Sequence, residues 1–84
     1  MTKTEKLRAA LLSRGFSPVE HASTRECLKG LTTGSKPLWV WPDRAGGARY
    51  SLTGKKTESH RMGEGTIKLL LEGKPSKVIP GGTA

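Results

Sequence analysis

The stretch from Leu38 to Gly54 constrains the fold of this chain more than any other. It reads Leu-Trp-Val-Trp-Pro, then Asp-Arg-Ala-Gly-Gly, then Ala-Arg-Tyr-Ser-Leu-Thr-Gly, and it holds both tryptophans and the only tyrosine. Aromatic and β-branched residues favour strands, and an aspartate followed shortly by two glycines suits a tight turn. The stretch therefore predicts a β-hairpin.

Two registers of this hairpin bury opposite faces, because successive side chains of a strand point to opposite sides. If Trp41 lies opposite Tyr50, with a four-residue turn, the aromatic residues share the core. If Trp41 lies opposite Arg49, with a turn of three or five residues and a glycine bulge, Trp39 and Trp41 face outward. We favour the first register, because burying a large aromatic side chain stabilises a fold by about 1.5–3 kcal/mol.

A helix is predicted before the hairpin, from Thr2 to Gly15. Thr2 and Glu5 fit a capping box, in which each side chain accepts a hydrogen bond from the other's backbone N–H. Leu7 and Leu11 share one face at helical spacing, and Gly15 can take the left-handed backbone that ends many helices.

A shorter helix is predicted after the hairpin, over residues 66–72 and beginning near Glu64. Ile67 and the leucines that follow it can face a core, and Gly73 ends the helix.

Residues 25–31 fit either a strand or a short helix capped by Ser23 and Glu26. A helix of two turns is marginal without strong packing, so a strand is favoured; the helical alternative would resemble a winged helix-turn-helix. The predicted fold is α+β: a small antiparallel three-stranded sheet with one clear hairpin, carrying an N-terminal and a C-terminal helix on one face and leaving the other face open to solvent. Residues 1–73 form one small domain, and residues 74–84 a flexible tail.

Charge is the strongest compositional signal. Fifteen Lys and Arg against seven Asp and Glu give a net charge of +8, which favours a polyanionic partner, most often nucleic acid. The single cysteine rules out an internal disulfide and fits a reducing cytoplasm, and no apolar run reaches membrane-spanning length. A chain this short buries only about 60 % of its unfolded surface, so a homodimer would add stability.

No catalytic, metal or cofactor site is predicted, and we expect no enzyme. Cys27, His21 and His60 are the only cysteine and histidines, and their spacing indicates neither a nucleophile–base pair nor a set of zinc ligands. Residues 54–57 read Gly-Lys-Lys-Thr, but Arg49 stands where a phosphate-binding loop needs its first glycine.

Basic residues interleaved with aromatic ones indicate a function, nucleic-acid binding, more strongly than these motifs indicate catalysis. Lys and Arg neutralise phosphates, and exposed rings stack on bases. The candidate nucleic-acid ligands are Arg44, Arg49, Lys55, Lys56 and Arg61, and the candidate stacking residues are Trp39 and Trp41.

Three segments together resemble small uncharacterised phage and prophage proteins of proteobacteria: Lys-Thr-Glu-Lys-Leu at 3–7, Ala-Gly-Gly-Ala-Arg at 45–49 and Leu-Leu-Leu-Glu-Gly at 69–73. The resemblance spans residues 2–73. It implies a place in the cytoplasm of a bacterial host and one of two roles, DNA or RNA binding, or inhibition of a host defence complex such as CRISPR by direct protein contact. We predict a non-enzymatic nucleic-acid-binding protein, with the inhibitor of a host protein complex as the alternative.

Overall fold

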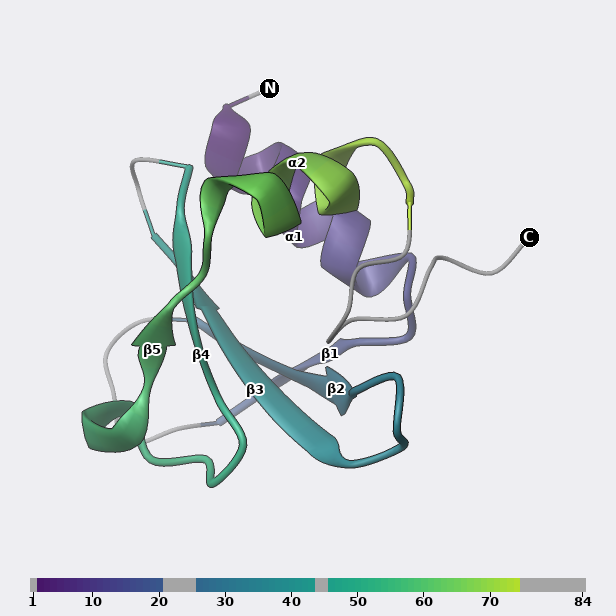
Figure 1. Cartoon of the computed structure of the whole chain (residues 1–84). Helices are drawn as coiled ribbons and strands as arrows, with labels where there is room; N and C mark the ends of the chain where they lie inside the picture. The colour runs from purple at the N-terminus through teal and green to yellow at the C-terminus, as the bar shows by residue number, and fades with distance from the viewer. Residues whose placement is uncertain (1, 21–25, 44–45, 75–84) are drawn as a thin grey trace.

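The computed structural model describes residues 2–20, 26–43 and 46–74, which build an antiparallel sheet with two helices over one of its faces (Figure 1). The elements are α1 (Lys3–Leu12), β1 (Ser17–Val19), β2 (Cys27–Leu31), β3 (Pro37–Pro42), β4 (Ala48–Ser51), the 3₁₀ helix η1 (Lys56–Glu58), β5 (His60–Arg61) and α2 (Glu64–Leu71). Each strand pairs with the next one in the sequence, so the sheet order is β1-β2-β3-β4-β5. No helix in these described ranges is long and apolar enough to cross a membrane.

The prediction of a three-stranded sheet is wrong, because the sheet has five strands. The α+β class and the two helices hold, and the strand predicted at residues 25–31 is present as β2. The two additional strands are the edge strands: β1 has three residues and contains Pro18, and β5 has two. Neither is long enough to show a period-two pattern, and short edges bearing proline or charge discourage pairing with other chains.

Helix α1 begins as its sequence predicts. The backbone N–H of Glu5 donates to Thr2 Oγ1 at 3.1 Å, and Glu5 Oε1 accepts from the backbone N–H of Thr2 at 3.5 Å. Leu7 and Leu11 on its inner face are fully buried. The chain leaves the helix through Gly15, whose φ of +87° is a conformation that glycine adopts without strain.

The core lies between the helices and the sheet. It is built by buried residues from both layers: Leu7, Leu11, Phe16, Leu28, Leu38, Val40, Ala48, Met62 and Leu70. Phe16 lies directly on Gly30 of β2, where a Cβ atom would stand 2.5 Å from the ring. Glycine is therefore required at this position for the helix layer to close on the sheet.

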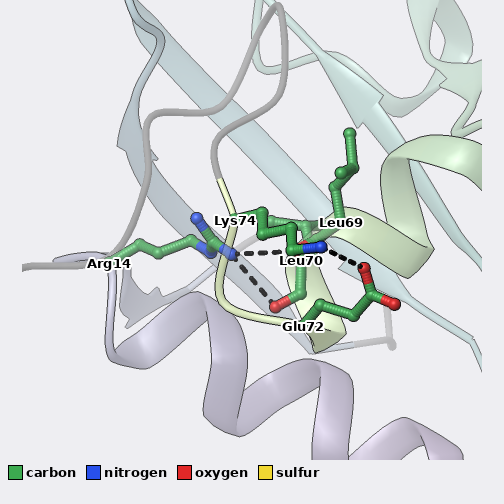
Figure 2. Close-up of polar contacts among 5 residues, drawn as sticks. All are labelled: Arg14, Leu69, Leu70, Glu72 and Lys74. Carbon is green, nitrogen blue, oxygen red and sulfur yellow. Dashed lines mark hydrogen bonds and ion pairs between the residues drawn. The ribbon is translucent and has the colours of Figure 1, made fainter.

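The ends of the two helices are tied together by Arg14 (Figure 2). Its Nη2 donates to the carbonyl oxygens of Leu69 at 3.3 Å and Leu70 at 3.0 Å. These carbonyls belong to the last turn of α2, where intrahelical donors run out and a cation is favoured by the helix dipole. Burial lowers the pKa of Arg14 from its ordinary value. Beyond the helix, Lys74 forms an ion pair with Glu72 at 3.4 Å.

The hairpin takes the register in which Trp41 lies opposite Arg49, so the prediction of an aromatic core register is wrong. The turn explains the outcome. The N–H of Asp43 donates to the carbonyl of Gly47 at 2.9 Å, and Gly46 has a φ of +84°. A residue in the left-handed region makes a bulge, and the turn geometry then fixes the pairing of both strands.

The face of the sheet away from the helices is only partly open to solvent, which corrects the second part of the prediction. Cys27, Trp41 and Ser51 lie on this face and are each 1 % exposed. The segment between β4 and β5 folds back over it: Gly54 packs against the ring of Trp39, and Ser59 is itself buried. Both faces of this small sheet therefore bury side chains.

Several predictions fall on residues outside the described ranges. These are the tail apart from Lys74, the candidate ligand Arg44, the catalytic candidate His21, and Ser23, the cap of the alternative helix.

Candidate nucleic-acid interface

The helix-free face carries one row of side chains centred on Trp39. Lys29 on β2 and Ser51 on β4 are its cross-strand partners, and cross-strand neighbours of this kind touch. The ammonium nitrogen of Lys29 lies 5.0 Å from the centroid of the Trp39 ring, a distance typical of a cation–π contact. Gly54 meets the same ring so closely that a Cβ there would stand 3.1 Å from it, and the exposed Lys55 follows directly.

A second row on the same face brings two arginines together. Arg49 on β4 lies directly opposite Arg61 on β5. The Nε–H of Arg49 donates to Ser59 Oγ at 2.8 Å, and its Nη2 donates to the carbonyl oxygen of Ser59 at 2.8 Å. A guanidinium group has five N–H donors, so three donors of Arg49 have no partner in the part of the chain that the structure describes. Arg61 is exposed.

No carboxylate in the described ranges neutralises this arginine pair. Glu58 in η1 accepts a hydrogen bond from Thr53 Oγ1 at 2.6 Å, and Glu26 forms an ion pair with Arg8 at 2.7 Å. Like charges directly opposite one another on neighbouring strands destabilise a sheet. An anion bound between the two guanidinium groups would remove that repulsion.

We call the exposed and half-buried basic residues of this face, together with Trp39, the basic sheet face. Its residues are Lys29, Trp39, Arg49, Lys55, Lys56 and Arg61.

Four of the basic residues singled out from the sequence belong to this face. Pairing of β4 with β5 brings Arg49 and Arg61 together, while Lys55 and Lys56 lie at the start of η1, which borders it. Sequence reasoning missed Lys29. The alternation of residues along β2 places it on the same face as Cys27, but only the β2–β3 register places it on Trp39.

The two tryptophans offer little surface for stacking on bases. Trp41 is 1 % exposed, so its ring does not reach solvent. Trp39 is half-buried and already contacts Lys29 and Gly54. The face therefore presents charge and directed N–H donors rather than a flat aromatic platform.

Of the three residues considered for catalysis, His21 lies outside the described ranges, and Cys27 and His60 lie apart. Cys27 is buried on the helix-free face, and that burial raises the pKa of its thiol. His60 on β5 is in register with Tyr50 and Val40, which places it on the helix side and three strands away from Cys27. Among residues 2–20, 26–43 and 46–74, no group of three or more His, Cys, Asp and Glu side chains could hold a metal ion.

No protein-family model, curated protein or solved structure matches this chain. The resemblance to phage proteins therefore stays a prediction. The geometry of the basic sheet face and the net charge of +8 are the features that point to a function.

Proposed function

We propose that the protein is a non-enzymatic nucleic-acid-binding module that holds the phosphate backbone of DNA or RNA on the basic sheet face. The observation that carries the proposal is the cross-strand pair Arg49 and Arg61, in which Ser59 fixes the guanidinium group of Arg49 and Arg61 is exposed. A phosphate between them accepts hydrogen bonds from both arginines and relieves their repulsion.

The anchoring of Arg49 supports this role. Guanidinium groups match the geometry of phosphate oxygens and make strong charge-assisted hydrogen bonds. Because two bonds to Ser59 already hold the side chain of Arg49, binding a phosphate costs less conformational entropy than it would for a mobile arginine. The alternative is a purely structural role, in which Arg49 only connects β4 to the segment before β5. That role accounts for the bonds to Ser59 and leaves the opposing Arg61 unexplained.

The surrounding lysines extend the contact along a strand of nucleic acid. Lys29 and Lys55 border Trp39, and both are exposed. Contacts to phosphates fix position and carry no direct sequence information. We therefore expect binding that tolerates most sequences and weakens steeply with salt.

The test is fluorescence anisotropy of a labelled DNA duplex, titrated with the parent protein and with variants at a series of salt concentrations. About four phosphate contacts give a slope of log K against log salt near −3.6. Arg61→Gln removes one contact, so the slope should become shallower by about 0.9. The matched control is Lys68→Gln, which removes the same charge from α2 on the other side of the sheet; its slope should stay at the parent value.

A second variant tests the anchoring without changing any charge. Ser59→Ala removes the Oγ that accepts from Arg49 and donates to the carbonyl of Lys56, and it leaves the bond from Arg49 to the backbone carbonyl of Ser59. The loss of one positioning hydrogen bond should weaken duplex binding by about twofold to tenfold. Because Ser59 is buried, thermal unfolding of the variant must be measured alongside binding. Absence of duplex binding by the parent at low salt, or equal slope changes for Arg61→Gln and Lys68→Gln, contradicts the proposal.

A further inference from the structure

A groove of about 600 Å³ lies on the helix side of the molecule, between α1, the β3–β4 turn and α2. Its floor is apolar and its rim is basic. The floor residues are Met62, Ile67 and Leu71, and the rim residues are Lys3, Lys6 and Lys68.

The groove continues along the seam between the two helices. A second hollow of about 370 Å³ shares Lys6 and Leu71 with the first and is also lined by Ala9, Ala10 and Ser13. The two hollows together follow α1 over its whole length, from Lys3 to Ser13. At 1.5 Å per residue this is about 15 Å, the length of a helix of nearly three turns and longer than a compact small molecule needs.

The groove exposes apolar surface at Leu71 and at the alanines of α1. Leu71 is 42 % exposed although it belongs to the amphipathic helix α2. Ala9 and Ala10 present only methyl groups along the neighbouring stretch of α1. Small side chains on the floor leave room for a partner's side chains to enter between α1 and α2.

The rim carries a surplus of positive charge. Arg61 joins the three lysines at the groove, against the two carboxylates Glu64 and Glu72. Glu72 is already paired with Lys74 at 3.4 Å. The cations gather around the first hollow, whereas the second is lined mostly by small and apolar residues.

From this geometry we infer that the groove along the α1–α2 seam docks an acidic amphipathic helix of a partner protein. Leucine-like side chains at i, i+3, i+4 and i+7 of that helix enter the apolar floor, as in other helix-in-groove complexes. Its carboxylates face the lysine rim, where complementary charge favours encounter and fixes orientation. A nucleic acid fits this groove less well, because the exposed leucine on its floor offers nothing to a phosphate.

The groove lies on the helix side and the basic sheet face on the other side of the sheet; Arg61, on the edge strand β5, is the residue they share. The groove goes beyond the proposed function and does not depend on it. It provides a binding surface for the alternative role predicted from the sequence, direct contact with a partner protein.

The test uses fluorescein-labelled synthetic peptides of about 15 residues, titrated with the full chain in anisotropy measurements. The probe peptide is an amphipathic helix with leucines on one face and glutamates beside them. One control peptide has the same composition with its leucines scattered around the helix, and another has lysine in place of glutamate. We expect saturable binding of the probe peptide alone.

Variants of the protein then locate the site. Leu71→Glu and Lys68→Glu should each weaken binding of the probe peptide by about tenfold or more. The matched control Lys55→Glu carries the same charge change on the basic sheet face and should leave peptide binding within about twofold. If Leu71→Glu lowers the unfolding temperature, Lys68→Glu on the exposed rim decides the result.

Three outcomes overturn the inference: no saturable binding of the probe peptide up to about 1 mM, equal binding of the scattered peptide, or equal losses for Lys68→Glu and Lys55→Glu. Displacement of the bound peptide by a DNA duplex also overturns it, because the groove would then belong to the nucleic-acid surface. The first three outcomes leave the salt slopes of Arg61→Gln and Lys68→Gln unaffected, so the two proposals fail separately, whereas displacement by DNA would go with a shallower slope for Lys68→Gln.

Discussion

The two tryptophans of β3 should contribute very unequally to stability, although they are two residues apart on the same face of the sheet. Trp41 is 1 % exposed and Trp39 is half-buried. Truncation of a fully buried aromatic side chain leaves a large cavity and costs about 3–5 kcal/mol. Trp39→Ala loses partial burial and a contact with Lys29, which together amount to about 1–2 kcal/mol.

Urea unfolding followed by far-ultraviolet circular dichroism measures this difference. With a denaturant slope of about 1–3 kcal/mol/M for a small protein, Trp41→Ala should lower the midpoint by more than about 1 M. Against a total stability of about 5–15 kcal/mol, much of the variant protein will already be unfolded if the parent lies at the low end. In each variant the remaining tryptophan serves as a fluorescent reporter, and the indole of Trp41 should emit at the shorter wavelength.

Equal destabilisation by the two substitutions would refute this reasoning. It would mean that both rings are buried alike, as the aromatic core register predicts. A larger effect of Trp39→Ala would show that Trp39 is the more deeply buried of the two.

Three further predictions concern single positions. Gly30→Ala should cost about 1–3 kcal/mol of stability, because the new methyl group overlaps the ring of Phe16. Gly65→Ala in α2 has nothing within 4 Å of the added Cβ, so it should be neutral or stabilising by up to about 1 kcal/mol. Thermal unfolding compares the two variants, and equal losses of stability would place Phe16 elsewhere. Thr2→Ala should cost about 0.5–2 kcal/mol through loss of the α1 cap, so an unchanged melting temperature would show that the capping box is not formed in solution. Burial raises the pKa of Cys27 in the folded state, so the unfolded state releases its thiol proton first as pH rises. The contribution of Cys27 to stability should therefore be full below the ordinary thiol pKa of 9.0 and fall above it. A Cys27→Ser variant that keeps this alkaline decline in stability would exclude the thiol as its cause.

The sequence determines the helices and the hairpin well, because each carries a local signal. The capping box of Thr2 and Glu5 fixes the start of α1, and the turn between Asp43 and Gly47 fixes the position of the hairpin. The edge strands β1 and β5 carry no such signal, because pairing of two or three residues is decided by the neighbouring strand and not by their own pattern.

The hairpin register could not be predicted from the hydrophobicity of its residues. That reasoning assumes that large aromatic residues lie on the helix-facing side. In the structure Val40 and Leu38 occupy that side, and Trp41 is buried on the opposite one. The left-handed backbone of Gly46 sets the turn and with it the register.

The candidate interface was predictable only in part. A run of basic residues around the hairpin points to Arg49, Lys55, Lys56 and Arg61 from the sequence alone. The contact of Lys29 with Trp39 and the anchoring of Arg49 by Ser59 depend on strand pairing and on a bend in the chain. No spacing in the sequence encodes either of them.

The most direct test of the central claim is a two-dimensional ¹H–¹⁵N NMR titration of the parent protein with a short DNA duplex. The account predicts that the largest shift changes occur at the backbone amides of Lys29, Arg49, Lys55 and Arg61 and at the indole N–H of Trp39. The amides of α1 and α2 should change little. Shift changes concentrated on the two helices, or none at low salt, would contradict the claim that the basic sheet face binds nucleic acid.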